Sequence, residues 1–92
     1  MTEFYTCPVC GYRYLNRPAW RGRNASDEIC PCCSIQFGYE DAAGGDFVER
    51  MILHARARAW WIADGCQWRT SIDPPADWNP IEQLLRIGVS PP

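Results

Sequence analysis

The sequence contains no lysine, only one histidine and no long run of apolar residues. A membrane-spanning helix needs about 20 predominantly apolar residues, so we expect no membrane association. Residues 1–6 have neither the basic region nor the apolar region of a secretory signal peptide, which favours a cytoplasmic protein. Because the cytoplasm is reducing, cysteines there bind metal more often than they form disulfides.

The residues that common catalytic sites need are also scarce. The single histidine, His54, has no carboxylate motif beside it, and Gly44-Gly45 lacks the lysine and the spacing of a phosphate-binding loop. No Ser/His/Asp arrangement can be assembled from the rest of the chain. We therefore predict that the protein is not an enzyme and that His54 lies at a surface or partly packed helix position. The sequence indicates no small-molecule substrate.

All nine basic residues are arginine, and the formal net charge is −2. This charge disfavours a general nucleic-acid-binding protein. A local cluster of arginines with aromatic residues among them nevertheless lies near the N-terminus: Arg13, Arg17, Arg21 and Arg23, with Tyr12, Tyr14 and Trp20. Such a cluster can contact phosphates and stack on bases, or contact a protein partner. The alternative is a solvated loop whose arginines pair with Asp27, Glu40 or Asp41.

What the sequence does contain is six cysteines, four of them in two Cys-x2-Cys motifs. These motifs, Cys7-Pro8-Val9-Cys10 and Cys30-Pro31-Cys32-Cys33, are separated by 19 residues. The spacing is typical of a zinc site with four thiolate ligands. The predicted ligands are Cys7, Cys10, Cys30 and Cys33.

Two cysteines remain outside this set. Cys32 takes the position that Val9 has in the first motif, so we expect it to point away from the metal as a small packed or solvent-facing side chain; a redox thiol is the alternative. Cys66 is predicted to be a small buried residue. Four thiolates leave no open position on zinc, which predicts a structural ion and not a catalytic one. Iron occupies the same tetrahedron, so iron remains the alternative metal.

The remaining pattern predicts a small α+β protein with a single domain, 1–92. Its first part, 1–40, is the metal module, a zinc-ribbon hairpin. Short strands are expected at 4–6 and 12–15, where β-branched and aromatic residues are frequent, and a loop is expected at 16–27. Its second part, 46–88, is helical.

Capping residues predict two helices in the second part. The first helix begins at Asp46 and ends at Gly65, and the second begins at Asn79-Pro80 and ends at Gly88. Apolar residues at helical spacing should pack both helices on the metal module. In the first helix these are Val48, Met51, Ile52, Ala55, Ala59, Ile62 and Ala63, and in the second they are Ile81, Leu84 and Leu85.

The cysteine motifs and their surroundings resemble a family. Cys7-Pro-Val-Cys-Gly-Tyr12 and Ile29-Cys-Pro-Cys-Cys-Ser-Ile-Gln-Phe-Gly-Tyr-Glu-Asp41 are similar to the bacterial cysteine-rich CPCC family of small uncharacterised proteins, and 59–65 and 74–85 are similar more loosely. The resemblance implies a rubredoxin-like zinc ribbon and no particular activity. The first motif is also similar to rubredoxin, which holds iron for electron transfer. Ser34 replaces the glycine usual after the second motif, so that turn is a candidate for mild strain.

These observations predict a zinc-binding, cytoplasmic interaction module with an unidentified protein partner. An iron electron-transfer protein is the first alternative. Weak nucleic-acid binding through 13–23 is the second, and it is less expected because the net charge is negative.

Overall fold

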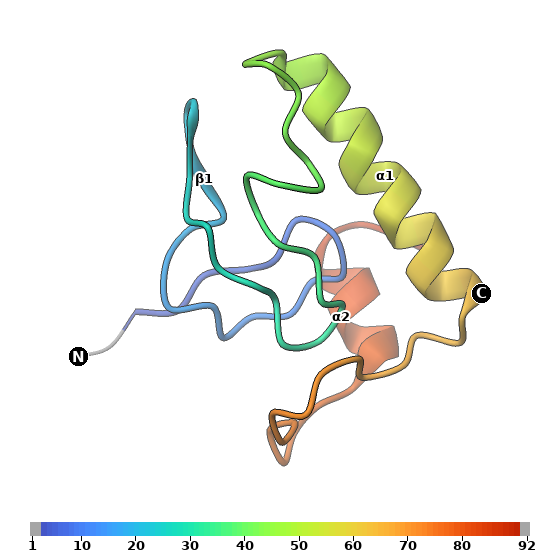
Figure 1. Cartoon of the computed structure of the whole chain (residues 1–92). Helices are drawn as coiled ribbons and strands as arrows, with labels where there is room; N and C mark the ends of the chain where they lie inside the picture. Colours follow the sequence, from blue (N-terminus) through green and yellow to red (C-terminus); the bar gives the residue numbers. More distant parts are fainter. Residues whose placement is uncertain (1–2, 91–92) are drawn as a thin grey trace.

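The structure is a computed structural model that describes residues 3–90. The predicted domain, 1–92, therefore begins and ends outside the described residues. Two antiparallel strands, β1 (Trp20–Arg21) and β2 (Asn24–Ala25), precede two helices, α1 (Phe47–Ala63) and α2 (Pro80–Arg86). This order confirms the predicted α+β class. Figure 1 shows α1 running along one side of a group of loops and α2 behind them.

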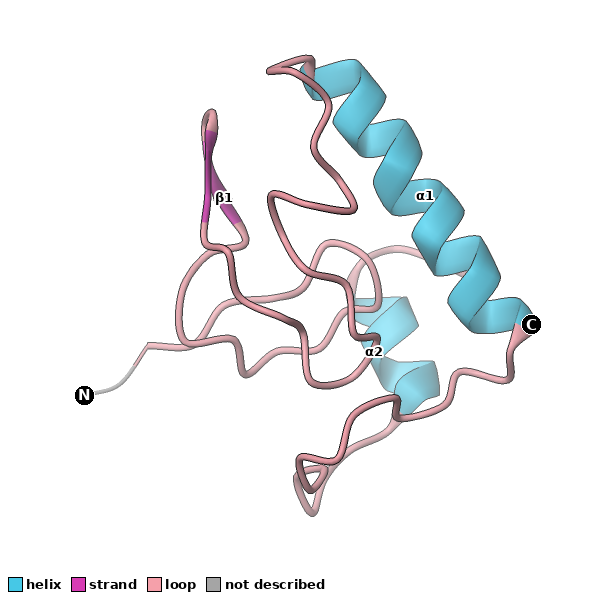
Figure 2. Ribbon diagram, in the orientation of Figure 1, coloured by secondary structure: helices cyan, strands magenta, loops and turns pink. Residues whose placement is uncertain are grey.

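Most of the chain outside the helices is loop, as Figure 2 shows. The regular strands are not where the sequence predicted them. Segments 4–6 and 12–15 meet only at one bridge, where Tyr5 and Leu15 exchange hydrogen bonds of 2.9 and 3.0 Å. Pairing stops there because 7–10 turns toward the other cysteines. The strands lie instead within 16–27, where Gly22, with φ of 59°, allows the tight turn between β1 and β2.

Both helices begin and end where the capping residues predicted. The Asp46 carboxylate accepts two backbone N–H bonds of 3.0 Å in the first turn of α1, and Gly65 follows its end with φ of 92°. The Asn79 side chain does the same for α2, Pro80 is the first helical residue, and Gly88 follows the end. Neither helix within 3–90 has both the length and the apolar content to cross a membrane.

The face that α1 turns inward differs from the one that its apolar pattern predicted. Val48, Met51 and Ile52 are exposed, Met51 over 70% of its surface. The buried side chains of α1 are His54 and Trp61, and the half-buried ones are Arg50, Leu53, Ala57, Arg58 and Ile62. Of the predicted apolar set, Ile62 alone packs against the core on this face. Polar side chains can occupy this face because the loops beneath it supply hydrogen-bond acceptors.

The core lies where the helices meet the cysteine-bearing loops. Besides the cysteines, its fully buried side chains include Val9, Phe37, Trp61 and Leu84. Both helices contribute to this core through Trp61 and Leu84, and no Cα atoms of α1 and α2 lie within 8 Å of each other. Leu85, which was predicted to pack inward beside Leu84, is exposed. A core with so few large side chains is typical of small domains that need a further cross-link.

Candidate metal centre

The four predicted ligands come together in this core. The Sγ atoms of Cys7, Cys10, Cys30 and Cys33 all lie within 4.8 Å of one another, and all four residues are buried. The Sγ···Sγ distances are 3.8 Å for Cys7–Cys33 and for Cys10–Cys30, well beyond the roughly 2.05 Å of a disulfide. Zinc–sulfur bonds of about 2.3 Å in a tetrahedron place neighbouring sulfurs about 3.8 Å apart. The donor set therefore fits a closed tetrahedral metal site.

The two Cys-x2-Cys turns have the same backbone hydrogen bonds. In each turn the first cysteine donates its N–H to the carbonyl five positions on, and its own carbonyl accepts from the amide four positions on. The distances are 2.7 and 3.0 Å at Cys7 and 2.9 Å for both bonds at Cys30. Because the turns match, each presents two thiols to the same centre.

The residue after each turn has a positive φ, 84° at Gly11 and 67° at Ser34. The conformation at Ser34 agrees with the strain predicted from its departure from glycine. Gly11 has a further reason to be glycine. A Cβ atom there would lie 2.2 Å from the backbone carbonyl oxygen of Gln83 on α2. The first turn and α2 thus approach more closely than any larger residue would permit.

Side chains of the helices bind the carbonyl groups of the first turn. Arg58 on α1 donates hydrogen bonds of 2.8 Å to the carbonyl oxygens of both Pro8 and Val9. Gln83 on α2, which is buried, donates to the carbonyl oxygen of Cys10 at 3.2 Å. Backbone carbonyls in a protein interior need such donors, so the helices and the turn stabilise each other.

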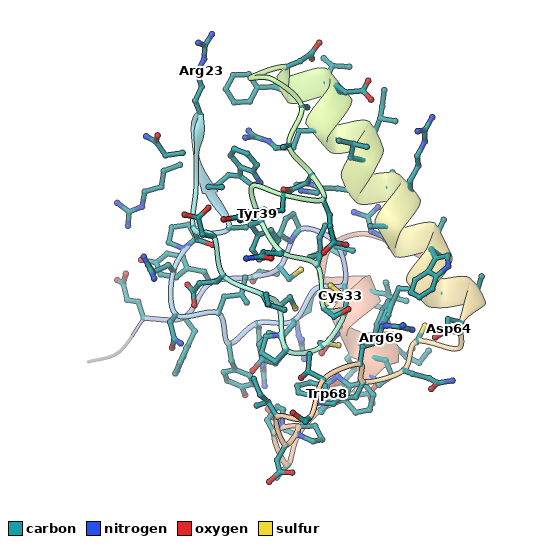
Figure 3. All side chains as sticks on the ribbon, viewed as in Figure 1. Arg23, Cys33, Tyr39, Asp64, Trp68 and Arg69 are labelled. Carbon is teal, nitrogen blue, oxygen red and sulfur yellow. The ribbon has the colours of Figure 1, made fainter. Side chains whose placement is uncertain are left out.

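The segment after α1 covers the second turn in the same way. The Thr70 hydroxyl donates to the carbonyl oxygen of Pro31 at 2.7 Å, and the Arg69 amide donates to that of Cys32 at 2.9 Å. Arg69 itself is held by an ion pair with Asp64 at the end of α1. Figure 3 shows Asp64 and Arg69 side by side there, with Cys33 toward the middle of the molecule.

Cys32 and Cys66 lie outside the four-thiol cluster, as predicted. Cys32 is packed and fully buried, with the Gln83 side-chain amide 3.5 Å from its Sγ. A hydrogen bond with Cys10 is the main cause that lowers the pKa of the Cys32 thiol. Cys66 is buried, and that burial raises the pKa of its thiol.

Burial and hydrogen bonds shift the pKa values of the clustered thiols in different directions. Burial raises the pKa of Cys10 well above its ordinary value, and hydrogen bonds with neighbouring thiols raise it further. At Cys7 burial also acts to raise the pKa, but hydrogen bonds from Cys10, Cys30 and Cys33 outweigh it and lower the pKa well below its ordinary value. A metal ion would bind four thiolates, so its binding would release protons from this site.

The predicted arginine cluster is divided among different neighbours. Arg13 is paired with Asp77 near α2, and Arg17 with Glu28 at 3.3 Å; neither acid was among the predicted partners. Arg21 and Arg23 are exposed on the hairpin. Figure 3 shows Arg23 at the tip of the hairpin, and a Cβ atom on Gly45 would lie 3.7 Å from its guanidinium carbon.

Trp20, one of the three aromatic residues of that cluster, is only partly available for stacking. It is half-buried, its indole N–H donates to Asp41 at 2.7 Å, and the Arg50 guanidinium lies 4.0 Å from the centre of its ring. Trp20 therefore belongs to the contact between the hairpin and α1.

Sequence reasoning missed a buried polar group at Asp41. Its carboxylate has no exposed surface and accepts from the Trp20 indole, from the Gly38 amide at 2.6 Å and from His54 at 2.7 Å. His54, which was predicted at a surface or partly packed position, is buried, since only 8% of this residue is exposed. The seven-residue spacing from His54 to Trp61 places both on one helix face and could have indicated its burial.

Comparison with known proteins identifies relatives of this chain. It is 30% identical over 87 residues to the uncharacterised protein YozI of Bacillus subtilis, and the match covers 84% of this chain and 72% of YozI. The chain belongs to the family of YozI. It is also 41% identical over 39 residues to the uncharacterised protein YoaQ of the same bacterium.

The two relatives are matched to different extents. The match to YoaQ covers 40% of this chain and only 33% of YoaQ, so the chain spans a third of that relative's length. No family model matches the chain, and no solved structure matches it. Membership of the CPCC family therefore stays a prediction.

Proposed function

We propose that this chain is a zinc-stabilised, non-enzymatic interaction module that works in the cytoplasm. The observation that carries the proposal is the cluster of four buried thiols, whose Sγ···Sγ distances of 3.8 Å suit a zinc tetrathiolate. Both turns that carry the thiols also hold the helices through hydrogen bonds. Zinc would therefore stabilise the whole chain and not the N-terminal loops alone.

A structural role for the ion follows from the number of protein ligands. Catalytic zinc sites keep one position open for water or substrate, whereas structural sites have four protein ligands. Cys7, Cys10, Cys30 and Cys33 supply all four. The burial of these residues also keeps solvent from the metal.

The interaction role rests on the outward side of α1. Val48, Met51 and Ile52, which lie within two turns of one another on α1, expose 67%, 70% and 41% of their surface. Grouped exposed apolar side chains are typical of surfaces that another protein covers. A protein partner is therefore favoured over a nucleic acid, for which Arg13 and Arg17 are already engaged in ion pairs.

Iron in the same site is the alternative, because iron and zinc share the four-thiolate tetrahedron. Metal analysis of protein purified from its native cells distinguishes the two. We expect one zinc per chain and a colourless protein. Stoichiometric iron and a red protein would favour electron transfer instead.

Zinc removal tests the structural role directly. Adding a strong chelator should abolish the cooperative unfolding transition, monitored by circular dichroism of α1 and by tryptophan fluorescence, and adding zinc back should restore it. A chelated, metal-free protein that keeps its full helix content and melting temperature would contradict the proposal. For the interaction role, Met51→Glu should abolish capture of a partner that the wild-type chain captures, while Ser71→Glu, at an exposed position outside that helix, should not.

A further inference from the structure

A cavity of about 370 Å³ opens between the N-terminal loops, the hairpin and α1. Arg50 and His54 of α1 form its polar wall, and Tyr5, Pro8, Pro18 and Trp20 form most of its apolar wall. We propose that this cavity binds a small organic anion. A carboxylate or phosphate head group would contact Arg50, and a flat apolar body would lie against Trp20 and the prolines. None of the four clustered thiols lines the cavity, so the inference is independent of the proposed function.

The Arg50 guanidinium is held in one position, and it still has N–H donors with which to bind a ligand. Its guanidinium carbon lies 4.0 Å from the ring centre of Trp20 and 4.7 Å from that of Phe47, and one nitrogen donates to the Gly22 carbonyl at 2.9 Å. Within 3–90 it forms no ion pair with a carboxylate. A guanidinium has five N–H donors in a fixed plane and binds carboxylates and phosphates through two of them at once. Because the rings already orient Arg50, a ligand would lose little affinity to ordering it.

His54 adds a second polar group whose orientation is fixed. The buried Asp41 carboxylate has three hydrogen-bond partners, Trp20, Gly38 and His54. An ionised carboxylate can only accept, and His54 must therefore donate to it from Nε2. The other ring nitrogen of the neutral ring, Nδ1, is then an acceptor, so Arg50 alone supplies donors to the anionic head group. Asp41 thus holds both Trp20 and His54 in place without taking part in ligand binding.

The shape and the wall of the cavity determine the class of ligand. The volume lies within the range of small-molecule sites, which begins at about 300 Å³. The cavity is shallow and open, and its wall is polar and apolar in about equal parts. Here the unpaired positive charge of Arg50 selects an anion. The ring of Trp20 and the two prolines select a flat or apolar body over a fully hydrated inorganic ion.

Titration calorimetry on the full chain loaded with zinc tests the proposal. Benzoate and phenyl phosphate combine an anionic head group with a flat body, inorganic phosphate has the head group alone, and benzyl alcohol has the body alone. We expect at least one of the two combined probes to bind with a Kd about tenfold or more below those of the single-part probes. The preferred combined probe distinguishes a carboxylate site from a phosphate site. Failure of both to bind, or equal binding of benzyl alcohol, would overturn the proposal.

Arg50→Gln and Arg56→Gln form a matched pair of variants. Both remove one positive charge from α1, but Arg56 is exposed and does not line the cavity. Arg50→Gln should raise the Kd of the bound probe by about tenfold or more, because charge-assisted hydrogen bonds are lost. Arg56→Gln should change it by less than about twofold. An equal loss in both variants would show non-specific charge attraction and would reject the site.

Nuclear magnetic resonance of the wild-type chain provides a test that does not depend on whether Arg50→Gln folds. The bound probe should shift the Trp20 indole N–H and the Thr6 amide, since both residues line the cavity. Shifts confined to other parts of the chain would place the probe elsewhere and overturn the proposal.

Discussion

A Cβ atom on Gly11 would lie 2.2 Å from the carbonyl oxygen of Gln83, so the first cysteine turn and α2 meet at a position that only glycine fits. Gly11 also has a φ of 84°, a backbone conformation that residues with a Cβ atom rarely adopt. We expect Gly11→Ala to reduce the free energy of unfolding by at least about 3 kcal/mol, since both backbone strain and a backbone clash are introduced. Chemical denaturation with zinc present measures the loss.

Ser34→Ala is the control for that variant. Ser34 has the same left-handed conformation at the matching position of the second turn and already carries a Cβ atom. Its replacement should change the free energy of unfolding by less than about 0.5 kcal/mol. Similar losses in the two variants would mean that the turns are sensitive to any substitution, and that the contact with Gln83 is not the cause of the loss at position 11.

Ser34→Gly should stabilise the protein. A side chain in the left-handed region costs about 1–2 kcal/mol, and glycine loses about 0.5–1 kcal/mol through its greater freedom in the unfolded chain. We therefore expect a net gain of about 0.5–1 kcal/mol in denaturant unfolding. Ser71→Gly, at an exposed serine without positive φ, should give no gain; a gain there of the same size would point to a cause other than strain at Ser34.

The neighbouring residues Cys32 and Cys33 test which cysteines bind the metal. Cys33→Ser removes a thiol from the four-thiol cluster, whereas Cys32→Ser changes a buried thiol outside it. We expect Cys33→Ser to lower the bound zinc, measured by mass spectrometry under native conditions, and to lower the melting temperature with it. Cys32→Ser should keep one zinc per chain. Loss of zinc from Cys32→Ser together with its retention in Cys33→Ser would overturn the assignment.

The two leucines of α2 test which face of that helix packs inward. Leu84 is completely buried and Leu85 is 58% exposed. We expect Leu84→Ala to cost about 2–5 kcal/mol in the free energy of unfolding, because it leaves a cavity in the core. Leu85→Ala should cost less than about 1 kcal/mol. Equal losses of unfolding free energy in the two variants would show that α2 is rotated about its axis and buries Leu85 as much as Leu84.

The contact between Asp77 and its two partners should make stability depend on pH. The Tyr14 hydroxyl, which donates to Asp77 at 2.7 Å, and the Arg13 guanidinium lower the pKa of the Asp77 carboxyl below its usual value of about 3.9. A group whose pKa is lowered by folding stabilises the protein above its unfolded pKa and loses that contribution as the pH falls through its folded pKa. The stability gap between the wild type and Asp77→Asn should therefore be constant near neutral pH and close below about pH 4.

Comparing Asp77→Asn with the wild type separates the Asp77 contact from loss of the metal at low pH, because that loss lowers the stability of both proteins alike. Asp73→Asn is the control, since Asp73 is exposed and forms no ion pair within 3–90. Asp73→Asn should show the same dependence of unfolding free energy on pH below about pH 4 as the wild type. High salt should reduce the difference in stability between the wild type and Asp77→Asn, because the contact of Asp77 with Arg13 is exposed to solvent.

Local signals in the sequence predicted the helix boundaries and the four clustered thiols. Asp46 and Asn79 act on amides two and three positions away, so their capping role can be read without knowledge of the fold. The Cys-x2-Cys spacing determines the local turn geometry in the same way.

The orientation of α1 could not be predicted, because its partners are distant in the sequence. Arg58 binds carbonyls about 50 positions earlier, and His54 binds Asp41, which lies in a loop. An apolar periodicity assigns arginine and histidine to the surface, since it does not include acceptors supplied by another segment. The side of α1 with the more apolar residues was therefore expected to face the core, and it faces solvent instead.

The two hydrogen bonds from Arg58 also determine the axial position of the longest helix. A shift of α1 by one residue would move that side chain by about 1.5 Å along the helix axis, enough to break bonds of 2.8 Å. Apolar contacts tolerate such sliding better, because they are not directional. The acceptors are carbonyls of the turn that carries Cys7 and Cys10, so the register of α1 is set by the same few atoms that enclose the thiols. Loss of the turn's geometry would therefore remove what fixes α1 on the core, and a helix of this length alone is only marginally stable in water.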